Sequence, residues 1–244
     1  MCGRYARSKD KAALVEEFAI QRQPEDDLSP DFNVAPTKRV YLVAARTDPQ
    51  EPAARPQRSL EVARWGLVPS WAKDISIGSR LINARVETAA TKPAFRKAFA
   101  ARRCLIPADG FYEWYASAAV GKGGKPIKQP FFIHAPDGRS LALAGLFEFW
   151  RDRAAQDDQP WLMSVTILTT TSTDALGRIH DRMPLPIRER DWDLWLDPGA
   201  APEQVQQVLG AHAAEQLTAY PVSTAVNNVR NNGPDLMQPL PPEA

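Results

Sequence analysis

The sequence predicts one α+β domain in which strands outnumber helices. Three apolar runs rich in Phe, Leu, Val and Ile, at 130–135, 141–150 and 161–169, are separated by turn residues and predict the core strands of a sheet. A chain of 244 residues is long enough for one large domain or two small ones. Because no repeat and no linker divides the chain, we expect a single domain over residues 1–244.

Short helices are expected to accompany the strands. Residues 8–18 have apolar side chains at helical spacing behind Ser8, a residue type that caps helix N-termini. Further short helices are expected at 92–100, 190–196 and 202–209. In the last of these, Pro202 stands at the start and Gly210 just past the end, which is the usual placement of the two residues.

Turn and loop residues predict the connections. The segment 102–115 is expected to form two strands that meet in a hairpin at Asp109-Gly110, because Asp-Gly is a strong hairpin signal. Surface loops are expected near 48–59, which has three prolines, and near 117–129, whose GKGGK lacks the spacing of a phosphate-binding loop. We expect the C-terminal tail, 235–244, to be flexible.

Composition and charge exclude several classes of protein. The net charge is +1, so overall charge does not indicate a nucleic-acid partner, and no apolar run approaches the roughly 18 residues of a membrane span. The two cysteines, Cys2 and Cys104, and the missing export signal predict a reducing, cytoplasmic environment. The three histidines are far apart and no CxxC or HExxH spacing occurs, so we expect no metal site and no cofactor.

The first residues carry the most specific chemistry. A small residue at position 2 favours removal of Met1, which would give Cys2 a free α-amine beside its thiol. Their reference pKa values of about 7.7 and about 8.5 keep a share of each group reactive near neutral pH. Such an aminothiol condenses with an aldehyde to an imine and then closes a five-membered thiazolidine ring. Cys2 could equally be an incidental residue of a frayed terminus.

Two further residues could transfer protons. Glu113 lies among aromatic residues, where a carboxylate is costly to bury unless a charged group such as an N-terminal ammonium pairs with it. His180 lies in a loop with arginines on both sides, which suits proton transfer near an anionic ligand. A solvated strand face for Glu113 and a surface position for His180 are the alternatives. Arg4, Arg85 and Arg182, together with Asn83, could bind a phosphate backbone, although most arginines are simply solvated.

Seven segments occur in an order that is typical of one protein family. They are Cys2-Gly3-Arg4-Tyr5, Asn33-Val34-Ala35-Pro36-Thr37, Trp65-Gly66-Leu67-Val68-Pro69-Ser70-Trp71, Ile82-Asn83-Ala84-Arg85-Val86-Glu87-Thr88, Asp109-Gly110-Phe111-Tyr112-Glu113-Trp114, Ile179-His180-Asp181-Arg182-Met183-Pro184 and Val222-Ser223-Thr224-Ala225-Val226-Asn227. The series closely resembles the SOS-response-associated peptidase (SRAP) family, the abasic-site processing proteins, from residue 2 to about residue 234. Each segment alone is a weak signal, whereas seven in order are highly specific.

The resemblance implies a fold and an activity. The fold is a single α+β domain with a barrel-like core of mostly antiparallel strands, flanking short helices and a basic groove for DNA. The activity is that of a sensor and shield of abasic sites in single-stranded DNA, which removes its own Met1 and forms a covalent DNA–protein crosslink through Cys2. The implied partner is single-stranded DNA with an abasic site, including one at a junction with double-stranded DNA. We expect a monomer that associates with the nucleoid when it is bound to DNA.

The resemblance also implies roles for individual residues. Cys2 is the nucleophile, Asn83 positions it, Glu113 is the acid/base group near the amine, and His180 is the second proton-transfer group. The implied DNA contacts are made by Arg4, Pro36, Trp71, Arg85, Trp114 and Arg182. Ala72 follows Trp71 where some relatives have a second tryptophan, which implies weaker stacking beside the lesion.

The chemistry of an abasic deoxyribose agrees with these roles. The sugar is mostly a closed hemiacetal, so ring opening needs a proton at the ring oxygen, a task suited to a histidine near pH 7. The amine must attack unprotonated, which suits a carboxylate that accepts and returns a proton. The imine also activates β-elimination of the 3′ phosphate, and closure by the thiol removes the iminium that this lyase-type step needs. Stacking and phosphate contacts without base readout are expected, because the target has no base.

Two other functions remain open at this point. A cysteine N-terminal-nucleophile amidohydrolase would also need a free Cys2, with His180 or Glu113 as the base, and predicts turnover of a small amide. A non-catalytic single-strand-binding protein predicts that Cys2→Ala leaves all DNA association intact, including association that survives denaturation.

Overall fold

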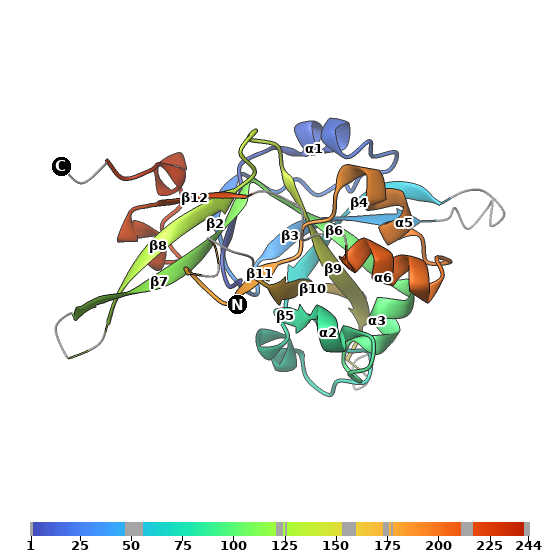
Figure 1. The fold of residues 1–244 in the computed structure, drawn as a ribbon. Coiled ribbons are helices and arrows are strands. Elements are labelled where there is room, and N and C mark those ends of the chain that lie inside the picture. Colours follow the sequence, from blue (N-terminus) through green and yellow to red (C-terminus); the bar gives the residue numbers. More distant parts are fainter. Residues whose placement is uncertain are drawn as a thin grey trace.

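A closed ring of five strands forms the core of the molecule (Figure 1). The computed structural model describes residues 2–46, 56–120, 124, 126–152, 160–172, 176, 178–210 and 217–241. The ring consists of β3 (Arg39–Arg46), β4 (Gln57–Trp65), β6 (Arg103–Ala108), β9 (Leu141–Trp150) and β10 (Leu162–Thr171). β10 pairs with β4 on one edge and β9 on the other, and β3 and β6 complete the ring. Within the ring, β4–β10 is the one parallel pair, so the predicted α+β fold with a barrel-like, mostly antiparallel core is confirmed.

The far end of β10 extends beyond β4 and holds two short strands. β5 (Asn83–Arg85) pairs with it in parallel, and β11 (Arg182–Pro184) pairs with it antiparallel. Strand pairing therefore brings together two segments that are far apart in the sequence. One carries Asn83, and the other begins two residues after His180.

A second, five-stranded antiparallel sheet packs beside the ring. Its strands, in spatial order, are β12 (Thr218–Pro221), β8 (Pro126–His134), β7 (Gly110–Val120), β1 (Tyr5–Arg7) and β2 (Asp31–Val34). In Figure 1, β7 and β8 form a long ribbon that extends away from the ring. The N-terminal strand β1 lies between β7 and β2, so the sheet fixes the backbone just after Cys2.

Alternation along β7 gives this sheet two different faces. Phe111 packs into the cluster shared with the ring, whereas Tyr112 packs with Phe132 of β8 and with the C-terminal segment. Successive side chains of a strand point to opposite faces. Glu113 therefore lies on the Phe111 face, toward the ring, and Trp114 lies on the face that the C-terminal segment covers.

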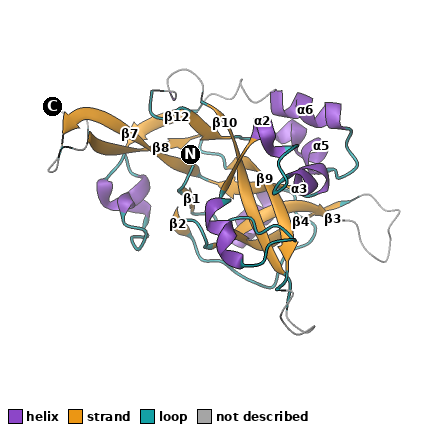
Figure 2. Cartoon of the chain, turned by 90° about the horizontal axis from the view of Figure 1, so that it is seen from below, coloured by secondary structure: helices purple, strands orange, loops and turns teal. Residues whose placement is uncertain are grey.

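Short helices pack mainly against the ring. They are α1 (Lys11–Glu17), α2 (Val86–Ala89), α3 (Arg96–Ala101), α5 (Trp192–Leu196) and α6 (Pro202–Gly210), with 3-10 turns η1 (Ile75–Arg80), η2 (Glu189–Asp191), η4 (Thr224–Asn227) and η5 (Pro234–Met237). In Figure 2, α2, α3, α5 and α6 gather at the end of the molecule away from the β7–β8 ribbon. Phe18 at the end of α1 stacks on Trp192 of α5, with ring centroids 4.7 Å apart. None of the helices in the described part of the chain is both long and apolar enough for a membrane span.

The predicted hairpin at Asp109-Gly110 is wrong. β6 and β7 do not pair, because the chain passes there from the ring to the second sheet. A Cβ on Gly110 would lie 2.5 Å from the Ile133 carbonyl oxygen, so glycine is required by close backbone contact with β8. The Asp109 carboxylate accepts a hydrogen bond from the Ser8 backbone N–H and ties the corner to β1. The Asp-Gly pair thus marks a corner between sheets.

Both predicted surface loops are shorter than expected. β4 already begins at Gln57, so the end of the predicted loop 48–59 is strand, and residues 48–55 lie outside the described residues. β7 continues to Val120 and β8 begins at Pro126, so most of 117–129 belongs to the ribbon, while 121–123 and 125 lie outside the described residues. Cross-strand pairing at Tyr115–Gln129 and Ala116–Lys128 overrides the weak strand propensity of this polar stretch.

Two chain-end predictions also need correction. The predicted flexible tail, 235–244, begins inside η5, and Leu236 is buried against the second sheet. Apolar burial therefore orders the tail through its first residues, and residues 242–244 lie outside the described residues. The first helix begins later than predicted, because Asp10, not Ser8, accepts the capping hydrogen bond from the Ala13 N–H at 2.8 Å.

Candidate active site

Cys2 lies in the contact between the ring and the second sheet. Its side chain is fully buried in an apolar cluster with Tyr5 and Trp65, whose rings lie 5.3 Å apart. The alternative of a frayed terminus is therefore wrong. Burial, and secondly the negative charge of Glu113, raises the pKa of the Cys2 thiol far above its usual range. Burial thus favours the protonated thiol, and Sγ lies 3.9 Å from the Arg4 carbonyl oxygen.

Asn83 fixes the backbone of Cys2. Its Nδ2 donates to the Cys2 carbonyl oxygen at 2.8 Å across the boundary between β5 and the N-terminus. This hydrogen bond sets the orientation of the amide and leaves Oδ1 on the other side. Oδ1 is buried and accepts no hydrogen bond within the described residues. A buried acceptor without a donor is costly, so this oxygen is a ready partner for an N–H or O–H group that enters the site.

Glu113 is buried on the face of β7 that is turned to the ring. Only 4% of the residue is exposed, so the alternative of a solvated strand face is wrong. Burial raises the pKa of the Glu113 carboxyl, and the positive charges of the chain's α-amino group and of His180 only partly oppose this effect. A carboxyl with a raised pKa near an imidazole is suited to accept and return a proton.

His180 approaches the same carboxylate from the segment before β11. Its side chain is 32% exposed, so it can reach both solvent and the buried site. The Arg182 backbone N–H donates to Nδ1 at 3.0 Å, which in the neutral ring leaves the proton on Nε2. An Asp181 carboxylate oxygen also lies 3.0 Å from Nδ1 and can pair with it only when the imidazole is protonated.

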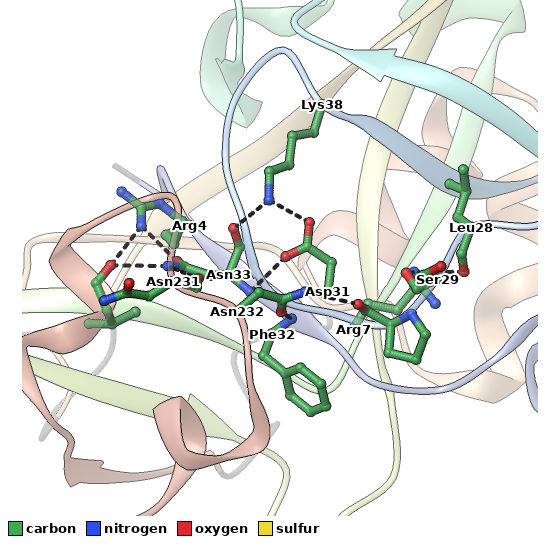
Figure 3. A network of polar contacts seen from close by, with 12 residues as sticks. Arg4, Arg7, Leu28, Ser29, Asp31, Phe32, Asn33, Lys38, Asn231 and Asn232 are labelled. Carbon is green, nitrogen blue, oxygen red and sulfur yellow. Dashed lines mark hydrogen bonds and ion pairs between the residues drawn. The ribbon is translucent and has the colours of Figure 1, made fainter.

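Arg4 has a structural environment that differs from that of a phosphate-binding arginine. Its Nη1 donates to Asn33 Oδ1 at 2.6 Å and to the Val226 carbonyl oxygen at 2.8 Å, as Figure 3 shows in part. The guanidinium also lies 5.8 Å from the Trp114 ring centroid. Arg4 thereby joins β1 and β2 to the C-terminal segment.

Trp114 and Pro36 lie at the edges of the same region. Trp114 is partly exposed, and its Nε1 donates to Asn227 Oδ1 at 2.7 Å, so η4 orients the indole ring. Pro36 is partly buried just after β2 and precedes Thr37, whose φ of 73° marks a tight turn before β3. Both residues keep part of their apolar surface accessible.

Arg85 and Arg182 differ in whether an acidic side chain already binds the guanidinium. Arg85 is exposed at the end of β5 and makes no ion pair within the described residues. Arg182 is largely buried and donates to both carboxylate oxygens of Glu87, at 2.6 and 3.0 Å, and to the Thr169 carbonyl oxygen at 2.6 Å. Arg85 can bind a phosphate as it stands, whereas Arg182 would have to exchange or share its partner Glu87.

Trp71 is exposed and Ala72 is buried. The Trp71 residue is 48% exposed, which suits stacking on a base, whereas Ala72 is only 4% exposed. The Ala72 carbonyl oxygen accepts a hydrogen bond from Trp150 Nε1 at 2.8 Å. A second tryptophan at position 72 would not fit without movement of this loop.

Comparison with known proteins identifies the family. The family model described as "SOS response associated peptidase (SRAP)" matches residues 1–229. The chain belongs to the SRAP family. It is 36% identical over 240 residues to the abasic site processing protein YoqW of Bacillus subtilis, covering 98% of this chain and 99% of that protein. It is 33% identical over 247 residues to the abasic site processing protein YedK of Escherichia coli, covering 98% of this chain and 100% of that protein.

Solved structures agree with this SRAP assignment at the level of the fold. A crystal structure of a Bacteroides thetaiotaomicron protein matches with a TM-score of 0.80 at 22% sequence identity, covering 98% of this chain and 100% of that chain. A second, from Bordetella bronchiseptica, matches with a TM-score of 0.68 at 26% identity, covering 91% of this chain and 100% of that chain.

Sequence reasoning missed the residue that organises this end of the SRAP domain, Asn33. Its side chain is fully buried, accepts from Arg4, and donates through Nδ2 to the carbonyl oxygens of Val226, Asn228 and Asn231 at 3.3, 3.1 and 3.0 Å. The sequence does offer one signal for Asn33, because the residue lies in the second of the seven family segments. The sequence alone could not separate a structural asparagine from a DNA-binding one.

Proposed function

We propose that the chain captures abasic sites in single-stranded DNA as a covalent DNA–protein crosslink through Cys2, after removal of Met1. One observation carries the proposal: Asn83 binds the Cys2 carbonyl oxygen, Glu113 is close enough for its charge to act on the Cys2 thiol, and His180 lies near the same carboxylate. Relatives over nearly the full length are named abasic site processing proteins, which supports the same substrate here. The crosslink would shield the lesion and make the protein part of a DNA damage response.

The first step is hydrolysis of the Met1–Cys2 amide. With Met1 present, the Cys2 nitrogen is an amide and cannot form an imine. Water adds its hydroxyl to the methionine carbonyl carbon, and the released Cys2 nitrogen receives a proton. The family description as a peptidase supports self-processing, with Glu113 or His180 as the group that activates water or the thiol. The product is free methionine and an α-amine at Cys2.

Ring opening of the abasic sugar follows. The hemiacetal O–H proton leaves and the ring oxygen gains a proton, which gives an aldehyde at C1′ and a hydroxyl at C4′. The imidazolium form of His180, with Asp181 beside Nδ1, can supply this proton and becomes the neutral imidazole, whose Nδ1 then accepts from the Arg182 backbone N–H. His180 therefore serves as the acid in ring opening and as the base when the ring closes again.

Imine formation and thiol addition complete the crosslink. The Cys2 amine adds to C1′, and loss of one water gives the imine, with Glu113 accepting and returning the proton. The thiol then adds to C1′, its proton moves to the nitrogen, and the five-membered thiazolidine is complete. Because burial keeps the thiol protonated, the amine rather than the sulfur attacks first. Loss of the iminium stops β-elimination, so the strand stays intact.

The DNA contacts in this proposal are sequence-independent. Arg85 is the exposed guanidinium nearest in the sequence to Asn83, and Trp71 and Trp114 offer accessible rings. Arg4 and Pro36 shape the site. Arg182 also contacts a phosphate, while its guanidinium stays paired with Glu87. We further propose that the protein acts as a monomer on exposed single strands and at junctions with double-stranded DNA, in the cytoplasm with the nucleoid.

Intact mass under denaturing conditions tests the proposal. Protein is measured with and without single-stranded DNA that contains one abasic site. We expect a chain lighter by one methionine, and an adduct equal to protein plus DNA minus one water. Retained Met1 without an adduct would contradict the proposal. It would favour the non-catalytic binding protein if DNA still bound. Loss of Met1 without an adduct, together with turnover of a small amide, would favour the amidohydrolase.

Substitution of Cys2 and His180 tests the individual steps. Cys2→Ser keeps the amine but loses the stable adduct, because a hydroxyl closes a weaker oxazolidine ring. A transient imine should remain trappable by borohydride. An undiminished, heat-stable adduct in Cys2→Ser would contradict the thiazolidine. His180→Ala should slow crosslinking and reversal alike, and unchanged rates in both directions would remove His180 from the mechanism.

A further inference from the structure

A groove outside the reacting groups runs along the second sheet beside the His180 segment. It has a volume of about 520 Å³, within the roughly 300–1,000 Å³ of small-molecule sites. Its lining includes Tyr115, Phe131, Leu176, Arg178, Ile179 and Ala219. None of these residues belongs to the reacting groups or to the proposed DNA contacts.

The floor of the groove is continuous with the site. Tyr115 stands two residues after Glu113 on β7 and therefore on the same face. Phe131 of β8 is the direct cross-strand partner of Glu113. Strand geometry thus places the two aromatic side chains of the floor next to the Glu113 carboxyl.

The opposite wall belongs to the segment that carries His180. Leu176 and Ile179 are partly buried against the apolar cluster that contains Cys2. Their turn is closed by hydrogen bonds from the Ile179 and His180 N–H groups to the Leu176 carbonyl oxygen, at 2.9 and 3.1 Å. The groove is therefore lined by neighbours of both proposed proton-transfer groups: Tyr115 and Phe131 are neighbours of Glu113, and Ile179 directly precedes His180.

The chemistry of the lining selects one kind of occupant. Tyr115 is 40% exposed and meets Phe131 edge to face, with centroids 6.5 Å apart. An exposed aromatic ring over an apolar floor suits a flat, apolar-faced group, and base–aromatic stacking needs no particular base. Arg178 is exposed at the rim and makes no ion pair within the described residues, so its charge is available for a phosphate.

We propose that this groove binds the unpaired nucleobase next to the abasic deoxyribose, with the adjoining phosphate at Arg178. The inference rests on the proposed function, since it assigns a subsite for the same DNA. A base can enter the groove only when it is unstacked and unpaired, so the groove would select single strands over duplex. It would also hold the lesion against Glu113 and His180 while the crosslink forms.

A fluorescent base tests the groove separately from the chemistry. The DNA is single-stranded and carries tetrahydrofuran, an abasic analogue without an aldehyde, with 2-aminopurine on its 5′ side or its 3′ side. Binding of the protein should change the 2-aminopurine fluorescence at one of the two positions. Tyr115→Ala should abolish this change and weaken binding about five- to a hundredfold, the range expected for one stacked base. Tyr115→Phe keeps the ring and should restore both.

Two further variants control for charge and for exposed aromatics. Arg178→Gln should weaken binding and reduce the slope of log affinity against log salt by about 0.7, the value for one phosphate contact on a single strand. Trp161, which is 59% exposed and lies outside the groove, provides the matched control, and Trp161→Ala should leave the 2-aminopurine signal unchanged.

The possible failures are distinguishable. If wild-type protein crosslinks a natural abasic site but Tyr115→Ala binds the analogue as tightly and leaves the fluorescence change intact, the groove inference is overturned and the proposed function stands. If wild-type protein neither crosslinks the natural site nor binds the analogue, both are overturned.

Discussion

At the scale of single residues, Glu113 shows how burial can oppose charge pairing. The carboxyl is almost fully buried, and its pKa is raised in spite of two positive groups nearby. The folded state therefore holds this proton to a higher pH than the unfolded chain does. The contribution of Glu113 to stability is most favourable below the usual carboxyl pKa of about 4 and is lost as the pH rises through the raised value.

Glu113→Gln should accordingly stabilise the fold while it removes activity. At pH 8 we expect a higher melting temperature than wild type, by about 2–4 °C for each kcal/mol of desolvation cost that the substitution removes. This gain in melting temperature should shrink as the pH falls toward 4. Thermal unfolding at several pH values measures this. Glu203→Gln makes the same charge change at an exposed position of α6 and serves as the control. A Glu113→Gln protein that is less stable than wild type at pH 8 would show that ion pairing outweighs desolvation.

Asn83 orients the backbone of Cys2. Its hydrogen bond to the Cys2 carbonyl oxygen is the only side-chain contact to that carbonyl within the described residues. Asn83→Ala should slow crosslinking about a hundredfold, because small displacements of a reacting group carry costs of that size. Asn83→Asp should be at least as slow, since a carboxylate would face the carbonyl oxygen without a proton to donate. The rate of adduct formation measures both, and rates near wild type would remove the positioning role.

At the scale of elements, the β10 end of the ring assembles the site. β5 and β11 both pair with the end of β10, and Arg182 of β11 reaches Glu87 of α2 to link the two. Glu87 is about half exposed, so this ion pair contributes at most about 1 kcal/mol to stability. Its main effect is to hold the Arg182 guanidinium in place and to neutralise it.

Glu87→Gln should therefore strengthen DNA binding with little change in stability. The variant removes a negative charge beside the proposed phosphate path and leaves the Arg182 charge uncompensated. We expect the slope of log affinity against log salt to steepen by about 0.7 for single-stranded DNA. Binding titrations at several salt concentrations measure this, with melting temperature as the control. Weaker binding in Glu87→Gln would show that Arg182 acts only by holding β11 against α2.

At the scale of the whole molecule, the two ends of the chain are joined across the second sheet. Arg4 and Asn33 bind carbonyl oxygens of the segment 226–231, more than 190 residues away in the sequence. Trp114 is a third residue that binds this segment, because its Nε1 donates to Asn227 Oδ1. The C-terminal segment is therefore a supporting wall for the face of β1 and β7 that lies behind the site.

Asn33→Ala should destabilise the whole fold. The substitution removes the buried oxygen that accepts from Arg4 and the Nδ2 group that donates to three carbonyl oxygens of the C-terminal segment, so we expect a loss of about 1–3 kcal/mol. Thermal unfolding measures the loss, and limited proteolysis should cut first in the segment after residue 222. Asn232→Ala removes an exposed asparagine of the same segment and should cost less. Equal melting temperatures for the two variants would contradict the role of Asn33 as the buried anchor.

The sequence by itself determined the strands, the family and the composition of the site. Apolar runs predicted β8, β9 and β10 because buried strands need continuous apolar side chains, and the ordered segments identified Cys2, Asn83, Glu113 and His180. These signals are local in the sequence, so they can be recognised without knowledge of the fold. The roles of these four residues stay predictions until the crosslinking experiments are done.

Only the tertiary structure decided how these signals combine. Asp109-Gly110 has the local chemistry of a hairpin turn, yet the pairing partners of β6 and β7 place them in different sheets. Arg4 and Arg182 have the chemistry of phosphate contacts, yet Asn33 and Glu87 already bind them. Strand partners and side-chain partners are set by contacts between residues far apart in the chain. Burial and the pKa of Glu113 depend on the same long-range contacts, which no local pattern of residues encodes.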